Sequence, residues 1–285
     1  MPIRVYVFLL VAMVSVSSTS LVIRHVSFVP ALTLAFWRML TASGMLWLYG
    51  ATKTNVPILP KNRNRIIFAG IFLGLHFALF FIGVRNTSVA SATLLANTGP
   101  IFTAIIAWHG NQKLSKWVYL GLVFSTVGIL IVQGSGLDDG TNALWANLIS
   151  LLSGFCIAIT YIFASKIRKD TDTAVYGRHV FFIAATTIGV IALLSGDSLF
   201  DFNKVAVPWF LFLGLVPSIL GHNLLNYSIR YLPPTAVASV PLGEPVLASV
   251  FGFLLFSEVV PVGALYGGPC LFFGIYLIIK NSSMD

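Results

Sequence analysis

Ten apolar stretches determine what this chain can fold into. At a rise of about 1.5 Å per residue, roughly 20 apolar residues in a helix cross a hydrocarbon core about 30 Å thick. Pro, Gly and charged clusters that mark turns separate the stretches. The stretches cover residues 4–23, 31–50, 66–84, 88–108, 116–133, 143–164, 174–195, 205–227, 235–256 and 262–279. We therefore expect an all-α membrane protein with ten transmembrane helices.

The composition agrees with burial in lipid and excludes several classes of protein. Apolar residues make up 57% of the chain and charged residues 9%, against roughly a quarter charged in an ordinary soluble domain. The net charge of +8 comes from Lys and Arg in short loops, so no basic face for nucleic acid is expected. Cys156 and Cys270 lie inside apolar stretches, which predicts neither a disulfide nor a thiolate metal site. No metal site and no cofactor are expected.

The distribution of Lys and Arg over the loops predicts the orientation in the membrane, because the side with more of them is cytoplasmic. The face that holds both termini carries twelve of these residues, and the opposite face carries three, Arg24, Arg85 and Lys204. The twelve are Arg4, Lys53, Lys61, Arg63, Arg65, Lys113, Lys116, Lys166, Arg168, Lys169, Arg230 and Lys280. We therefore expect a multi-pass protein of the inner (plasma) membrane with the N- and C-termini cytoplasmic.

An internal repeat sets the expected architecture. A shift of about 145 residues aligns the second half with the first, and it places His222 of the eighth span on His76 of the third. The halves, residues 1–136 and 137–285, have five spans each, an odd number, so the second half must enter the membrane inverted. Inverted repeats are common in secondary transporters, whose substrate site lies near the midplane where the repeats meet. The expected fold is two inverted five-helix repeats that move against each other.

Glycines recur at equal spacing in the two halves. Those of the fifth span are Gly121 and Gly128, and those of the tenth are Gly267 and Gly274. Gly at regular spacing lets two helices approach closely in lipid. We expect these residues to pack helices and not to contact a substrate.

Two residues of fixed charge, Arg38 and Glu244, lie deep inside predicted spans. A charge at the bilayer centre costs about 2.5–3.5 kcal/mol on insertion scales, so such residues face the bundle interior. Glu244 lies between Pro241 and Pro245. It is either a packing contact between helices or a carboxylate that couples protons or binds an amine. Arg38 either pairs across the bundle or anchors a substrate carboxylate or phosphate. Both residues are candidates for coupling or gating.

Two prolines hold equivalent positions in the halves, Pro100 in the fourth span and Pro245 in the ninth. Each removes one backbone hydrogen bond in mid-membrane. Such a loss is tolerated where neighbouring groups or a cavity satisfy the freed carbonyl. Each proline therefore marks either a packing kink or a break that lines a cavity.

Polar and aromatic side chains are predicted to line a central cavity. In the eighth span Asn223 and Tyr227 are four residues apart and share a helix face, and the third span has an aromatic counterpart in His76 and Phe80. One polar and one aromatic wall suit an amphipathic organic solute. A lone His, however, is more often a hydrogen-bonded packing residue than a proton relay. The predicted substrate-binding residues are His76, Phe80, Asn97, Tyr161, His222, Asn223 and Tyr227.

Two motifs carry a resemblance to a known family. Residues 242–248, with Ser257 and Glu258 at the helix end, are similar to a Glu-Pro motif and its closing Glu, and residues 34–38 are similar to an apolar-aromatic stretch that ends in Arg. On these motifs the chain resembles the EamA-type transporters of the drug/metabolite transporter superfamily over nearly its whole length. The chain departs from the family pattern at Lys113, where an acidic residue is usual.

The resemblance implies a ten-helix fold with a central cavity bounded by the first, third, fourth, sixth, eighth and ninth helices. Arg38 and Glu244 recur as pattern positions in carriers of different cargoes, which implies a shared structural or gating role for them. Members of the family carry amino acids, other metabolites or toxic amphiphiles, often outward and often with proton coupling or exchange.

The leading hypothesis is a secondary active transporter of small organic metabolites, above all amino acids or related compounds, that works as an exporter or exchanger. The first alternative is a multidrug-type exporter of lipophilic cations, with Glu244 as the countercharge. The second is a membrane-embedded enzyme acting on lipid-linked substrates, but no catalytic or metal-binding motif supports it, and the chain is expected not to be an enzyme. Expected partners are a small-molecule substrate, the lipid bilayer and protons as coupling ion, with the chain as a monomer or homodimer.

Overall fold

A computed structural model describes residues 2–51, 57–134, 144–256, 260 and 262–282. Nine helical stretches of this part are long and apolar enough to cross a membrane, and the apolar helix over Lys116–Val132 is a shorter tenth. The expected fold class, an all-α membrane protein of ten helices, is therefore confirmed. The expected boundary between the halves, at residues 136–137, lies outside the described residues, as do Lys53, Ser257 and Glu258.

The first half forms five spans, two of which are broken. The second, third and fifth spans are single helices: α3 (Ala31–Ala51), α4 (Pro60–Asn86) and α7 (Lys116–Gln133). The first span consists of α1 (Ile3–Val16) and α2 (Ser18–His25), and the fourth consists of α5 (Val89–Ala96) and α6 (Gly99–His109).

The second half repeats this plan with more irregular helices. The sixth, seventh and tenth spans are α8 (Leu144–Ile167), α9 (Thr173–Leu194) and α14 (Val262–Lys280). The eighth span consists of η2 (Lys204–Ala206), α10 (Val207–Leu213), the π-helix η3 (Gly214–Asn223) and α11 (Leu224–Ser228). The ninth span consists of α12 (Pro234–Ser239), the 3-10 helix η4 (Val240–Gly243) and α13 (Glu244–Phe256).

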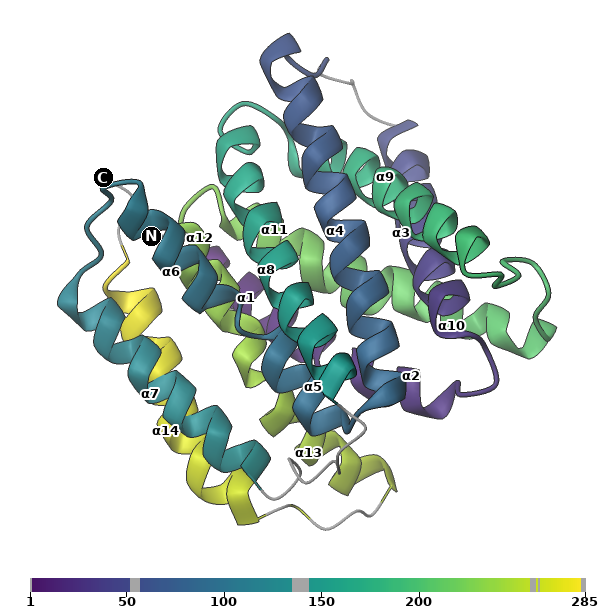
Figure 1. The fold of residues 1–285 in the computed structure, drawn as a ribbon. Helices are drawn as coiled ribbons and strands as arrows, with labels where there is room; N and C mark the ends of the chain where they lie inside the picture. The colour runs from purple at the N-terminus through teal and green to yellow at the C-terminus, as the bar shows by residue number, and fades with distance from the viewer. Residues whose placement is uncertain (1, 52–56, 135–143, 257–259, 261, 283–285) are drawn as a thin grey trace.

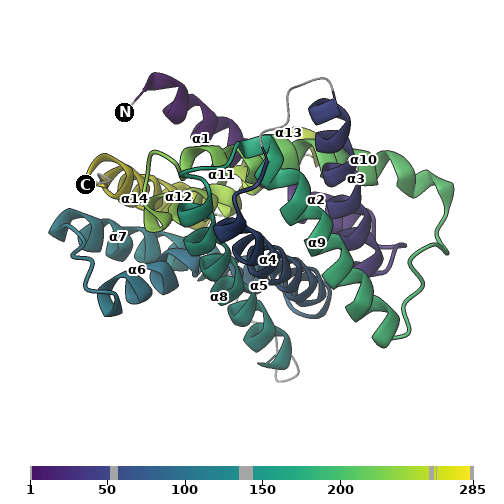
Figure 2. The same cartoon turned by 90° about the horizontal axis from the view of Figure 1, so that it is seen from above.

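The halves interlock and do not lie side by side. The spans α3 and α9, which the repeat makes equivalent, pack on each other, and so do α7 and α14 (Figure 1). The pair α4 and α8 is equivalent under the repeat to the pair of η3 and α1, and both pairs are in contact. Seen from above, α7 and α14 lie together at one side of the bundle and α3 and α9 at the other (Figure 2). Spans of both halves thus contribute to each packed unit.

The third span begins earlier than its hydropathy predicts. The apolar run predicts a start at residue 66, whereas α4 begins at Pro60, so that a proline occupies the first turn. Pro is favoured there because its fixed φ suits a helix and its missing N–H is not needed. The added residues include Lys61 and Arg63, both exposed, so they extend the helix beyond the apolar core and escape a search for apolar runs.

The paired glycines pack α7 against α14, as expected. A Cβ added to Gly121 would come within 2.7 Å of the carbonyl oxygen of Gly274, and one added to Gly267 within 2.8 Å of the backbone nitrogen of Val132. Neither position has room for a side chain unless a backbone moves. Dispersion contacts between closely approaching backbones hold helices together in lipid, where apolar burial supplies little driving force.

Replacing Gly267 by Val should therefore destabilise the protein by about 1–3 kcal/mol through overpacking. Thermal unfolding of the purified protein in detergent measures this loss. The matched control is Gly44→Val in α3, because a Cβ at Gly44 meets nothing within 4 Å. Equal melting temperatures for the two variants would contradict the close packing of α7 and α14.

Candidate functional site

A cavity lies at the centre of the bundle, where helices from both halves meet. Seven spans contribute to it: the first four, the sixth, the eighth and the ninth. The resemblance named six of these spans, and the structure adds the second through Arg38. Its lining residues are Val16, Thr19, Arg38, His76, Phe77, Phe80, Ala96, Asn97, Gly99, Ile157, Tyr161, His222, Ala238, Pro241 and Glu244.

Breaks in the helices bring polar groups to this cavity. The fourth span is interrupted between α5 and α6, and Asn97 and Gly99 at the interruption line the cavity. In the ninth span the 3-10 turn η4 separates α12 from α13, and Pro241 and Glu244 line the cavity there. Pro100 and Pro245 each follow such a break near the start of a new helix, where no N–H is required. Of the two interpretations of these prolines, the structure supports the break that lines a cavity.

Arg38 is held in the cavity wall by one hydrogen bond and one ring. Its Nε donates to Ser218 Oγ over 2.9 Å, and Ser218 Oγ in turn donates to the carbonyl oxygen of Leu213 over 2.8 Å. The guanidinium carbon lies 4.2 Å from the centre of the Phe77 ring, a cation–π contact. The side chain is completely buried, and its Nη1 and Nη2 have no hydrogen-bond partner among the described residues. Two donors of a buried cation are thus left over for a ligand or water.

Glu244 faces the same cavity from the first turn of α13. It is 6% exposed, and its neighbours include the side chains of Ser20 and Asn97 and the charge of Arg38. Glu244 Oε1, Ser20 Oγ and Asn97 Nδ2 are buried, and none of these three atoms makes a hydrogen bond within the described residues. Arg38 and Glu244 interact through their charges, yet no direct ion pair joins them in the described structure. The carboxylate keeps free acceptor capacity toward the cavity.

The two repeat-related histidines meet at the cavity. The rings of His76 and His222 are 6.4 Å apart, and the Phe77 ring lies edge-on to His222 at 5.0 Å. His76 Nδ1 lies 3.0 Å from the carbonyl oxygen of Ser153 and 2.8 Å from Ser153 Oγ, which itself donates to the carbonyl oxygen of His76. Because a carbonyl oxygen can only accept, we assign the proton to Nδ1, which leaves Nε2 as an acceptor. His76 is thus both a packing residue and a cavity residue.

The structure brings seven of the nine predicted site residues together. His76, Phe80, Asn97, Tyr161 and His222 line the cavity with Arg38 and Glu244. The hydroxyl of Tyr161 is buried and has no hydrogen-bond partner among the described residues. It adds one further polar atom to the wall.

Asn223 and Tyr227 are not among the cavity-lining residues. The side chain of Asn223 lies against Gly177 of α9, on another side of the eighth span. Tyr227 packs edge-on against Phe8 at 5.0 Å and contacts Tyr231 at the end of the span. Asn223 therefore contacts α9 and Tyr227 contacts α1, while His222 lines the cavity.

Sequence reasoning missed four hydroxyl-bearing neighbours of the site: Thr19, Ser20, Ser153 and Ser218. Each is a small hydroxyl residue inside an apolar span, where such a residue usually bonds to its own helix backbone. Only the packing of distant spans reveals that Ser218 meets Arg38 and that Ser153 meets His76. The run Ser17-Ser18-Thr19-Ser20 was the available signal, since four consecutive hydroxyl residues are unusual in lipid.

The cavity is small in this conformation. The centre of a water molecule can move through about 40 Å³ of it. At about 10–15 Å³ for each water, that is room for about three waters. An organic metabolite does not fit into this volume unless the helices separate.

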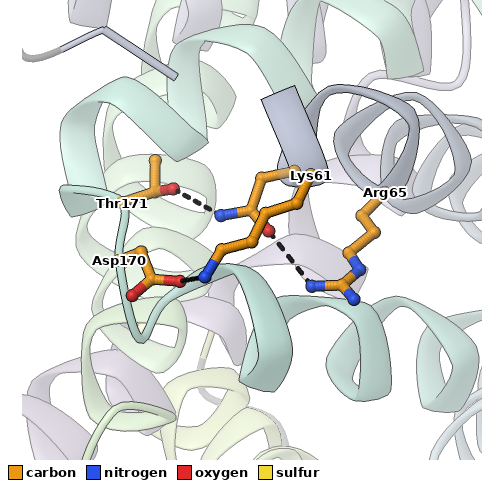
Figure 3. A network of polar contacts seen from close by, with 5 residues as sticks. Lys61, Arg65, Asp170 and Thr171 are labelled. Atoms are coloured by element: carbon orange, nitrogen blue, oxygen red, sulfur yellow. Dashed lines mark hydrogen bonds and ion pairs between the residues drawn. The ribbon is translucent and has the colours of Figure 1, made fainter. Parts of the chain in front are cut away.

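A polar network ties the connection between α8 and α9 to α4 (Figure 3). Lys61 Nζ and Asp170 Oδ2 are 2.7 Å apart, the one ion pair found within the described ranges. Asn62 Nδ2 donates to Thr171 Oγ1 over 3.3 Å, and Arg65 Nη1 donates to Asn62 Oδ1 over 3.3 Å. The network joins the first half of the chain to the second at one end of the bundle.

Arg168 ties the same connection to the eighth span. Its Nε donates to the carbonyl oxygen of Asn226 over 2.9 Å, and its Nη1 and Nη2 donate to the Thr171 carbonyl and the Thr173 hydroxyl. Burial lowers the pKa of Arg168 to about 10, so the guanidinium stays charged at neutral pH. One side chain therefore fixes the loop and the end of α11 together.

Replacing Arg168 by Gln should lower the free energy of unfolding, by about 1–3 kcal/mol for each buried acceptor left without a donor. Thermal unfolding of the purified protein tests this. Lys169→Gln, at an exposed neighbouring position, is the control and should unfold like the parent protein. A variant at position 168 as stable as this control would refute the structural role of Arg168.

Comparisons with known proteins add three findings. The model of the EamA-like transporter family matches residues 3–133 and 144–280. The transporter YdfC of Bacillus subtilis is 27% identical over 261 residues, which cover 88% of this chain and 83% of YdfC. The threonine/homoserine exporter RhtA of Escherichia coli K12 is 23% identical over 198 residues, which cover 70% of this chain and 65% of RhtA.

The fold also matches that of a solved structure. A protein known from a crystal structure superposes with a TM-score of 0.80 over 97% of both chains. Its sequence identity is 13%, so this likeness concerns the fold alone.

Proposed function

The chain belongs to the EamA-like transporter family, and from this premise we propose that it carries a small zwitterionic metabolite, an amino acid or a related compound, by alternating access. The family comprises transporters and not enzymes, so the chain is a membrane transporter and the expectation that it is not an enzyme is confirmed. The substrate, the direction and the coupling ion belong to the proposal.

The observation that carries the proposal is the pair of opposite charges on one cavity. Arg38 presents two unpartnered donors and Glu244 an unpartnered acceptor. An amino acid carries a carboxylate and an ammonium group on one carbon atom, which complement these two side chains. Arg binds a carboxylate through two parallel hydrogen bonds, and charge-assisted bonds are about twice as strong as neutral ones. A zwitterion would satisfy both side chains without adding net charge to the membrane interior.

The similarity to RhtA supports this class of cargo. RhtA is named as an exporter of threonine and homoserine, and the aligned region covers 70% of the present chain. Both compounds are small amino acids that carry a side-chain hydroxyl. The free polar atoms of Asn97 and Tyr161 in the cavity would suit such a hydroxyl.

Arg38 weighs against a lipophilic cation as the cargo. A cation bound at Glu244 would share the cavity with the guanidinium, and like charges repel strongly where little water screens them. The Phe77 ring, which could otherwise contact a cation, already lies under Arg38. The alternative is a multidrug-type exporter, and the binding experiment below distinguishes it from a carrier of amino acids.

The proposal also covers proton coupling and the orientation of the chain in the membrane. Glu244 is the one carboxylate in the described spans, which makes it the candidate for exchanging protons during transport. The excess of Lys and Arg on the side of the termini supports a cytoplasmic location for both ends. We assign Arg38 and Glu244 to substrate binding and gating in an exporter or exchanger built from residues 1–136 and 137–285.

Replacing Glu244 by Gln should weaken amino acid binding about 10-fold to 100-fold, because one charged hydrogen bond contributes about 1.5–3 kcal/mol. Arg38→Gln should act similarly. Thermal stabilisation of the purified protein by a panel that contains threonine, homoserine, other amino acids and lipophilic cations measures binding. The matched control is Asp201→Asn, an exposed carboxylate on a loop outside the cavity, which should bind like the parent protein.

Stabilisation by lipophilic cations and not by amino acids would establish the alternative cargo. Transport in proteoliposomes tests the coupling separately. The Glu244→Gln variant should lose the dependence of transport on a proton gradient, and an unchanged dependence would remove Glu244 from that role while leaving the cargo assignment intact.

A further inference from the structure

A second, larger hollow lies on the lipid-facing side of the first half, between α6 and α7. The centre of a water molecule can move through about 460 Å³ of this groove. Four of its lining residues are on α6 and five on α7, and Thr126 is the one hydroxyl residue apart from Tyr119. The lining residues are Ile101, Ala104, Ile105, Trp108, Tyr119, Leu122, Val123, Thr126 and Val127.

The groove exists because two consecutive helices pack on different neighbours. The helix α6 packs on α8 and α12, whereas α7 packs on α14. Seen from above, α7 lies between α6 and α14 (Figure 2). The short connection at residues 110–115 therefore closes the groove at one end, while its side stays open to the bilayer.

The chemistry of the groove suits an acyl chain and not a polar solute. Its walls are aliphatic along most of their length, and Ile105 and Val123 are 45% and 59% exposed there. Trp108 and Tyr119 stand at the end near the connection, where amphipathic rings mark the level of the lipid headgroups. An apolar surface that opens sideways into a bilayer suits an acyl chain.

Positive charge gathers at that same end. Lys113 lies in the connection, and Lys116 begins α7 with its Nζ 5.6 Å from the centre of the Trp117 ring, one turn of helix before Tyr119. Both lysines are exposed. Residues 1–137 contain ten Lys and Arg residues and no Asp or Glu, so no acidic side chain of the first half can neutralise them.

We propose that the groove between α6 and α7 binds an anionic phospholipid, with one acyl chain between the helices and the phosphate at Lys113 and Lys116. The apolar walls account for the chain, and the two lysines account for the charge of the headgroup. An uncharged or zwitterionic lipid with the same chains would fill the groove but gain less from the lysines. The site is separate from the central cavity and does not rest on the proposed cargo.

Lipid titrations of the full chain in detergent test the proposal. Phosphatidylglycerol should raise the melting temperature more than phosphatidylcholine with identical acyl chains. In the variant Lys113→Gln/Lys116→Gln, the phosphatidylglycerol concentration for half-maximal stabilisation should rise about 30-fold, given the typical contribution of each Lys near an anionic lipid surface. The charge-matched control is Lys169→Gln/Lys204→Gln, two exposed lysines outside the groove. An equal rise in both double variants, or in neither, would overturn the proposal.

Photo-crosslinking locates the acyl chain. A phosphatidylglycerol with a photoreactive group in its acyl chain should label peptides of α6 and α7, and Val123→Trp, which fills the groove from an exposed position, should reduce that labelling. Labelling confined to other helices, or unaffected by this variant, would refute the site. Equal stabilisation by glycerol phosphate alone would identify a free anion as the ligand and overturn the proposal. Crosslinks that join α6 or α7 of one copy of the chain to the same helices of a second copy would also overturn the proposal.

Discussion

The buried guanidinium of Arg38 is the constraint around which the centre of this protein is built. A completely buried cation in a bundle surrounded by lipid must be compensated, and no carboxylate in the described structure pairs with it directly. Instead the compensation is divided among the Ser218 hydroxyl, the Phe77 ring and the more distant Glu244. Each of these groups contributes part of the stabilisation, and none uses the outer nitrogens of the guanidinium. The arrangement tolerates a charge while leaving its strongest donors available.

The irregular backbone of the eighth and ninth spans brings polar groups to Arg38 and the cavity. Ser218 reaches Arg38 from η3, a π-helix that contains Pro217, and Glu244 reaches the cavity from a helix that begins after a 3-10 turn. A regular helix in lipid satisfies all its backbone groups internally and so presents little polarity to a ligand. Four of the seven spans that line the cavity, the first, fourth, eighth and ninth, are broken or rewound in the described structure. Their breaks provide polar atoms at mid-membrane depth, whereas α7 and α14, which do not line the cavity, pack closely on each other.

The sequence predicts the outline of this structure well, for physical reasons that apply to each span. The lengths of the apolar stretches predicted the ten helices. The glycines of α7 and α14 predicted a close helix contact, because a residue without a side chain allows two backbones to approach closely. Arg38 and Glu244 could be found because charge is costly in lipid. Asn223 and Tyr227 show where this reasoning stops, since a polar residue in a span can contact a neighbouring helix, here α9 or α1, and the sequence does not tell this from a place in the cavity wall. Hydroxyls such as Ser153 and Ser218 carry no signal of their own, because their partners lie far away in the sequence.

The interlocked packing bears on the alternating access proposed above. If the sequence halves moved as rigid bodies, α4 and α8 would have to separate, and so would α1 and η3, although both pairs are packed together. We propose these two equivalent pairs as the moving units of the proposed transport cycle, each with one span from each half. His76 lies on the first unit and His222 on the second, with the cavity between them. A cargo bound there would contact both units at once, so the polar contacts that bind it would also favour closure of the units around it.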